Sequence, residues 1–206
     1  MTPRRRLAKL AIPVLQAGVA VVLVYGILVW SPGIIVNALL GLGVTYLPAI
    51  LANDYDLRLS PALVLLVALS VFLHTIGMIG LYDRTWWWDH LTHALSAAVV
   101  TSVAYATVSA LDNHHEDLVL PAHFLAVFLL TSTLALGVLW ETLEFVARDL
   151  GTLIGAEPVL VVYGVSDTLL DLVFDAVGAL IVGVVGVHRL GSDVASLTTW
   201  LKTKRG

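Results

Sequence analysis

The stretch LAIPVLQAGVAVVLVYGILVW, Leu10–Trp30, decides the class of fold, because it runs from end to end without a charged side chain. A helix needs about 20 predominantly apolar residues to cross the hydrocarbon core of a bilayer. Five further stretches of this kind follow it, at Gly33–Ala52, Pro61–Gly80, Trp88–Ala110, Pro121–Phe145 and Asp167–His188. The sequence therefore predicts an all-α fold, a polytopic membrane helix bundle of about six transmembrane helices.

The overall composition agrees with this prediction. Of the 206 residues, 59% are hydrophobic and 13% are charged, and the mean hydropathy is +0.93. Soluble domains carry about 25% charged residues, so this chain lacks the polar surface of a soluble protein. The composition excludes a soluble globular protein, a disordered chain and a nucleic-acid binder, and the absence of cysteine excludes thiolate sites. We expect residues 1–206 to form a single integral membrane domain in the lipid bilayer, and the sequence leaves the oligomeric state open.

Basic residues predict the orientation, because loops on the cytoplasmic side carry an excess of Lys and Arg. Six spans place both termini on one side. Nine basic residues fall on that side, namely Arg4, Arg5, Arg6, Lys9, Arg58, Arg189, Lys202, Lys204 and Arg205. Arg84 and Arg148 fall on the other side. The sequence thus predicts a multi-pass protein of the cytoplasmic membrane with both termini in the cytoplasm, and a short polar tail at residues 190–206.

Ionisable side chains are concentrated in the second half of the chain. The first three spans contribute only His74, whereas the last three carry Asp89, His90, His93, Glu141, Glu144, Asp167, Asp171 and Asp175. Such groups are costly in a membrane and face the interior of a bundle. At a rise of 1.5 Å per residue, the main candidates lie within ~12 Å of the outer ends of their helices. We expect them to converge in one layer that opens to the outside.

The spacing of these groups aims them at one another. Within each helix they are three or four residues apart and share a face, pairing Asp89 with His93, Glu141 with Glu144, and Asp167 with Asp171 and Asp175. Carboxylates with one or two imidazoles suit Mg²⁺, Mn²⁺, Ca²⁺ or Zn²⁺. We assign Asp89, His93, Asp171 and Asp175 as possible ligands of a divalent metal ion, and Glu141 or Glu144 as the catalytic general base.

Each main candidate also has a purely structural interpretation. Asp89 and His93 could form a satisfied pair at a helix N-terminus, where the helix dipole favours a carboxylate. Asp167 fits the N-cap or first turn of its helix better than a ligand role. Asp171 and Asp175 lie too deep for capping, and their alternative is a hydrogen-bond network between helices.

The remaining candidates lie around this cluster. A lone histidine in the position of His74 is more often a hydrogen-bonded core residue than a metal ligand. His90 is a further candidate for the site. Glu144 and Arg148 are spaced for an ion pair at the rim. Small residues on the last span, among them Gly178 and Gly183, would let a neighbouring helix pack closely.

Three motifs on consecutive spans resemble the YjdF-type membrane proteins, prokaryotic inner-membrane proteins without an established activity. They are WDHLTH (88–93), WETLE (140–144) and YGVSDTLLD (163–171), the last leading to DAVGA (175–179). The match covers about residues 82–185, and the order D-x-x-x-H, E, D-x-x-x-(N/D)-x-x-G is more remotely similar to VanZ-like proteins, which are associated with glycopeptide resistance. The resemblance marks as characteristic positions Asp89, His93, Glu141, Glu144, Asp167, Asp171 and Asp175. It implies no substrate.

We expect the polar layer to belong to a cation-dependent enzyme that acts on lipid headgroups or lipid-linked envelope intermediates. Two other classes of function compete with this interpretation. A secondary transporter or cation-conducting protein would carry polar groups along the whole path and usually an internal repeat. The inner halves of the last three spans contain no carboxylate, and the first three spans do not repeat the charges of the last three. The other alternative is a membrane scaffold whose polar layer is purely structural.

Overall fold

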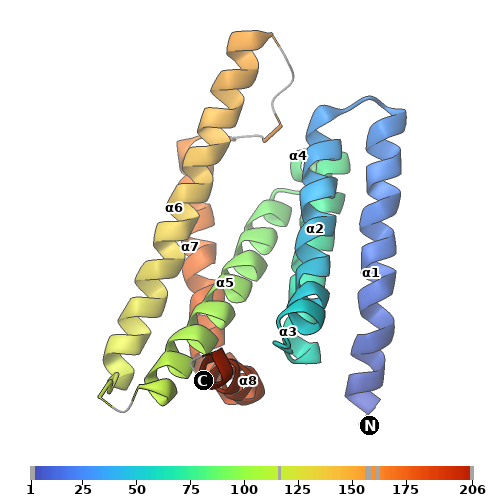
Figure 1. The fold of residues 1–206 in the computed structure, drawn as a ribbon. Coiled ribbons are helices and arrows are strands. Elements are labelled where there is room, and N and C mark those ends of the chain that lie inside the picture. The colour runs from blue at the N-terminus through green and yellow to red at the C-terminus, as the bar shows by residue number, and fades with distance from the viewer. Residues whose placement is uncertain (1–2, 116, 156–158, 161–162, 205–206) are drawn as a thin grey trace.

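A computed structural model describes residues 3–115, 117–155, 159–160 and 163–204 of the chain. Its long helices are α1 (Pro3–Leu28), α2 (Pro32–Asp54), α3 (Pro61–Ile76), α5 (Trp87–His114), α6 (Ala122–Ile154), α7 (Val165–Ile181) and α8 (Gly191–Lys204) (Figure 1). Short turns η1 (Gly77–Leu81) and α4 (Tyr82–Arg84) follow α3, and η2 (Val182–Gly186) and η3 (Val187–Arg189) follow α7. Within the described residues, six helical segments are long and apolar enough to cross a membrane, which confirms the predicted all-α, six-span architecture.

The helices form two groups that meet at α3 and α5. Helices α1, α2 and α3 pack on one another, while α5 packs on α7, α6 and α8. The beginning of α1 and the end of α8 lie at the same end of the bundle (Figure 1), as an even number of spans requires. Which side of the membrane this end faces stays a prediction. The side chains of Arg4, Arg5, Arg6, Lys9, Lys204 and Arg205, on which the predicted orientation depends, lie outside the described part of the chain.

Helix α6 is longer than the predicted span, which was expected to end at Phe145. It continues to Ile154, for a total of 33 residues, and ends where Gly155 adopts the left-handed conformation at φ 68°. Such a helix is about 50 Å long, which exceeds the hydrocarbon thickness of a bilayer. Its last turns therefore project beyond the other helices (Figure 1). Gly151 lies within the helix and is buried.

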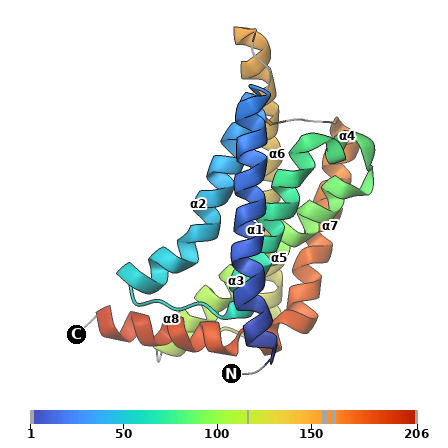
Figure 2. The ribbon, with the colours of Figure 1, turned by 90° about the vertical axis from the view of Figure 1, so that its right-hand side faces the viewer.

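Residues 191–204 form helix α8, where the sequence predicted only a polar tail. The helix lies crosswise at the end of the bundle (Figure 2) and packs against α5. Asp193 anchors it: this side chain is fully buried, and its Oδ1 accepts a 2.6 Å hydrogen bond from the backbone N–H of Ser60 at the start of α3. The low apolar content of residues 191–204 gives no indication of this helix, because the contact that anchors it is made by a buried carboxylate.

A kink after α3 carries Tyr82 back over the bundle. Gly80 adopts φ 108°, a conformation that glycine permits without strain, and the chain turns there into α4. Gly77 leaves room for two aromatic rings, since a Cβ at this position would lie 2.5 Å from Tyr82 and 2.9 Å from Trp88 Nε1. The kink thereby places Tyr82 at the edge of the polar cluster described below.

A glycine permits the close crossing of α5 and α7. A Cβ added at Gly178 would overlap the carbonyl oxygen of Ala94, whereas one added at Gly183 would meet nothing within 4 Å. We expect Gly178→Ala to destabilise the bundle by about 1–3 kcal/mol through overpacking. Unfolding in detergent micelles measures the change, and Gly183→Ala is the matched control with no loss. Equal stability of the two variants would show that α5 and α7 do not pack this closely.

Candidate polar site in the bundle

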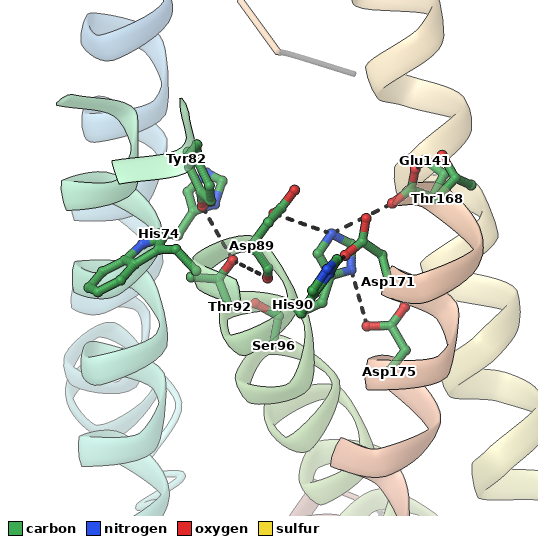
Figure 3. Close-up of polar contacts among 12 residues, drawn as sticks. His74, Tyr82, Asp89, His90, Thr92, Ser96, Glu141, Thr168, Asp171 and Asp175 are labelled. Carbon is green, nitrogen blue, oxygen red and sulfur yellow. Dashed lines mark hydrogen bonds and ion pairs between the residues drawn. The ribbon is translucent and has the colours of Figure 1, made fainter. Parts of the chain in front are cut away.

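His93 lies at the centre of the polar cluster, on α5. Its ring contacts three carboxylates from three helices: Nδ1 donates to Asp175 Oδ1 at 3.3 Å, while Nε2 lies 3.6 Å from Glu141 Oε1 and 3.9 Å from Asp89 Oδ1. Figure 3 labels these three carboxylates. His93 is only 8% exposed. One imidazole thus joins α5, α6 and α7.

Two buried carboxylate oxygens beside this ring have no hydrogen-bond partner within the described part of the protein. They are Glu141 Oε1 and Asp175 Oδ2. The other oxygen of Glu141 accepts a 2.7 Å hydrogen bond from the Thr168 hydroxyl on α7. Buried polar atoms are almost always satisfied in folded proteins, so a proton, a water molecule, a ligand or an ion is needed to satisfy these two oxygens.

His90 forms a second contact between α5 and α7, one turn closer to the helix start. Its Nδ1 donates to Asp171 Oδ1 at 2.8 Å, and both residues are 2% exposed. Phe174 stacks on the imidazole with ring centroids 4.9 Å apart. The ring is therefore held in one orientation by a carboxylate on its edge and an aromatic ring on its face.

Two sets of three residues have the geometry of a cation site. One ligand atom each from Asp89, His93 and Asp171 lies within 4.8 Å of the others, and the same holds for His90, Asp167 and Asp171. Ligands at 2.0–2.6 Å from an ion lie at most about 5 Å apart. Both sets therefore fit around a cation, and Asp171 belongs to each of them. Asp175 belongs to neither set, because it lies on the Nδ1 side of His93.

A hydrogen-bonded chain extends from the cluster toward α2. The Tyr82 hydroxyl lies 2.7 Å from His74 Nδ1 and 3.3 Å from the Thr92 hydroxyl (Figure 3). His74 Nε2 lies 3.2 Å from Asn37 Oδ1. Both nitrogens of His74 are occupied, as expected of a core histidine. Asn37 in turn donates to the carbonyl oxygen of Val159 at 2.9 Å.

Sequence reasoning did not single out Tyr82, Thr92 or Thr168. Thr168 could have been found, because it lies three and seven residues before Asp171 and Asp175 and so shares their helix face. Tyr82 could not, since its place depends on the kink at Gly80.

The remaining candidates lie at the rim. Glu144 is half-buried and lines the cavity described below. The predicted Glu144–Arg148 pair is not what the structure shows: Arg148 binds Asp149 at 2.8 Å and covers the ring of Phe145 instead. Asp167 lies in the first turn of α7, as predicted.

Tyr163 precedes α7 and lines the cavity beside the cluster. Its hydroxyl donates to Asp83 Oδ1 at 2.9 Å. Burial, together with this hydrogen bond and the charge of Asp83, raises the pKa of Tyr163, because ionisation would place two negative charges side by side. The hydroxyl therefore stays protonated at neutral pH and keeps this link between α4 and the segment before α7.

A cavity of about 620 Å³ adjoins the cluster. Its polar end is formed by Asp89, His93, Glu144, Asp175, His74 and Tyr82. The rest of its wall comes mainly from apolar residues of α2, α3, α5 and α6. Its size falls within the range of ligand-binding pockets, and the polar groups at one end would fix the orientation of a ligand.

Comparison with known proteins adds the family but no activity. An uncharacterized protein of Thermotoga maritima is 30% identical over 119 residues, which cover 55% of this chain and 56% of that protein. The chain therefore matches only about half the length of this relative. No solved structure matches the chain significantly. The family model described as "Predicted membrane protein (DUF2238)" matches residues 11–192. Since this match spans nearly the whole six-span bundle, the chain belongs to the DUF2238 family of predicted membrane proteins.

Proposed function

We propose that this multi-pass membrane protein is a divalent-cation-dependent enzyme acting on lipid headgroups or lipid-linked intermediates of the cell envelope. The observation that carries the proposal is the meeting of Asp89, His93 and Asp171, whose ligand atoms lie within 4.8 Å of one another. The unpartnered buried oxygens of Glu141 and Asp175 beside them support it, because a purely structural network would satisfy its own members.

The donor set indicates which cations fit. Ca²⁺ and Mg²⁺ prefer ligand shells made of oxygen, whereas imidazole with carboxylates suits Zn²⁺ and Mn²⁺. His93 would bind the ion through Nε2, since Nδ1 donates to Asp175. This carboxylate–imidazole pairing fixes the ring and its tautomer in many metal sites. In this proposal Asp175 positions His93, while Asp89, His93 and Asp171 hold the ion.

Glu141 is the better of the two candidates for the general base. Thr168 holds one of its oxygens at 2.7 Å, and the other faces His93 without a hydrogen bond. A bound divalent cation would polarise a phosphoryl or carbonyl oxygen and acidify water. In this proposal Glu141 Oε1 takes the proton of that water, and Glu144, which lines the cavity, contacts the headgroup.

The position of the site in the bundle points to a lipid substrate. His93 lies about 9 Å along α5 from its first residue, Trp87. This depth corresponds to the boundary between headgroups and acyl chains, where the ester and phosphoester bonds of lipids lie. The resemblance to YjdF-type and VanZ-like proteins agrees with a role at the cell envelope and supplies no substrate.

The proposed reaction is tested with purified protein in liposomes that contain headgroup-labelled phospholipid or a lipid-linked sugar phosphate. We expect headgroup release that needs Zn²⁺ or Mn²⁺ and stops with chelator. Cation flux in the same liposomes, abolished by Asp171→Asn and not accompanied by release, would instead establish the transporter. If neither release nor flux occurs, and if added metal leaves the stability of the protein unaltered, the polar layer has only a structural role.

Gly137 tests the positioning role of Asp175. A Cβ at this position on α6 would overlap Asp175 Oδ2, so Gly137→Ala must displace the carboxylate that holds His93. We expect the affinity for Zn²⁺ or Mn²⁺, measured by titration calorimetry, to fall about 10–100-fold. Gly43→Ala, where a Cβ meets nothing within 4 Å, is the control. Unchanged affinity in Gly137→Ala would remove Asp175 from the account.

We infer that both termini lie in the cytoplasm and that the site opens to the outside. The nine basic residues on the terminal side support this orientation. The chain has no native cysteine, so single cysteines at the exposed positions Asn113 and Thr152 report the topology. A membrane-impermeant thiol reagent added to intact cells should label Thr152→Cys and spare Asn113→Cys. The reverse pattern would turn the site toward the cytoplasm.

A further inference from the structure

We propose that the cavity beside the polar cluster receives the hydrocarbon chain of a membrane lipid, which enters sideways from the bilayer between α2 and α6. This inference rests on the proposed function for the reaction, and it adds how the substrate reaches the site. It concerns binding, so it is measurable without turnover.

The cavity is long and follows the helix axes. Its lining residues on α5 extend from Asp89 to Val100, and those on α6 from Thr133 to Glu144. Each of these stretches is about 16 Å long at 1.5 Å per residue. One leaflet contributes about half of the ~30 Å hydrocarbon core, so the cavity has the depth of one leaflet's chains.

Below the cluster, the described residues of the wall offer no free polar group to a soluble ligand. The hydroxyls in it satisfy one another or a neighbour: Ser70 pairs with Ser96 at 3.1 Å, and Thr133 pairs with Thr101 at 2.8 Å. The other side chains at this depth are apolar. A wall of this kind favours a hydrocarbon chain, whereas the charged end of the cavity favours a headgroup.

The opening lies between two helices that both line the cavity. On α2 the lining residues are Asn37, Leu40, Gly41 and Val44, which share one face. Helix α2 packs on α1 and α3, while α6 packs on α5 and α7, and the described residues show no extensive packing of α2 on α6. At the two edges, Leu40 is 66% exposed and Leu139 is 52% exposed. Both edges belong to spans, so the opening faces lipid.

The experiment uses the full chain in nanodiscs made with a phosphatidylethanolamine that carries a diazirine near the end of one acyl chain. After photolysis, crosslinked residues are mapped by mass spectrometry. Ala97 is the diagnostic position, because it lines the cavity but is only 4% exposed and lies out of reach of lipids around the protein. We expect crosslinks at Ala97 and at neighbouring Val100. Crosslinks confined to the outer faces of the helices would overturn the proposal.

Matched variants test the route of entry. Leu139→Trp should block the opening and abolish the crosslink at Ala97, whereas Leu150→Trp, on the same helix at 54% exposure and away from the cavity, should retain it. The second pair lies across the opening, on α2. Val44→Trp, at a residue that lines the cavity, should also block entry, whereas Val36→Trp, at a residue that does not line it, is the control. Crosslinking at Ala97 that survives both Leu139→Trp and Val44→Trp would contradict entry between α2 and α6.

A variant of the polar cluster separates this inference from the proposed reaction. His93→Gln removes the imidazole and leaves the apolar wall intact. We expect it to lose headgroup release and to keep the crosslink at Ala97. A wild type that crosslinks at Ala97 but binds no divalent cation would refute the reaction and leave the lipid site standing, and the opposite result would refute the lipid site alone.

Discussion

Asp171→Asn is expected to abolish the stabilisation of the protein by divalent cations. Asp171 belongs to both sets of cation-ligand geometry, and its Oδ1 also holds His90 at 2.8 Å. A ligand that binds only the folded state contributes about 2.7 kcal/mol at a hundredfold excess over its dissociation constant. In a chain of this size, that is a shift in Tm of roughly 5–10 °C. The wild type should show this shift with Zn²⁺ or Mn²⁺, and Asp171→Asn should not.

Asp149→Asn is the matched control for this measurement. Asp149 is an exposed aspartate on α6 that binds Arg148, outside the cluster. Its replacement should leave the metal-dependent shift unchanged. An equal shift in wild type and Asp171→Asn would mean that the cation binds elsewhere, and the absence of a shift in the wild type would mean that the cluster is a protein-only network.

Glu141→Gln should retain the bound cation and lose the reaction. The amide keeps the size of the side chain and can still accept from Thr168, but it cannot take a proton at Oε1. General-base catalysis typically contributes 10²–10⁴-fold, so the rate of headgroup release should fall by about that factor. The metal-dependent shift in Tm should persist, which distinguishes a lost base from a lost ion.

Glu144→Gln is the comparison for this variant. Glu144 lines the cavity one turn away on the same helix, and we expect its replacement to act mainly on KM, through headgroup contact. If Glu144→Gln instead lowered kcat to the level expected of Glu141→Gln while the latter stayed active, the roles of the two glutamates would be exchanged.

Much of the architecture could be predicted from the sequence, because apolar length is a direct physical requirement for crossing a bilayer. The same rule explains two differences. It locates the part of α6 within the membrane but not its extension to Ile154, because apolar length does not mark where a helix ends beyond the hydrocarbon core. It also misses α8, whose stability comes from packing on α5 and from the buried Asp193.

The layer of ionisable groups could be predicted because spacing along a helix fixes both depth and face. The partners of each group could not be predicted. His93 binds Asp175 through Nδ1 and faces Asp89 and Glu141 through Nε2, an arrangement set by the rotation of α5 against α6 and α7. That rotation depends on contacts such as Gly178 against Ala94, which a linear pattern does not specify.

An anomalous difference map from crystals of the protein grown with Zn²⁺ or Mn²⁺ would locate the bound cation. We expect one peak at about 2.0–2.2 Å from His93 Nε2, with carboxylate oxygens of Asp89 and Asp171 as further ligands. A map with no peak among these three residues, at a metal concentration that saturates any shift in Tm, would contradict the central claim that this cluster binds a divalent cation.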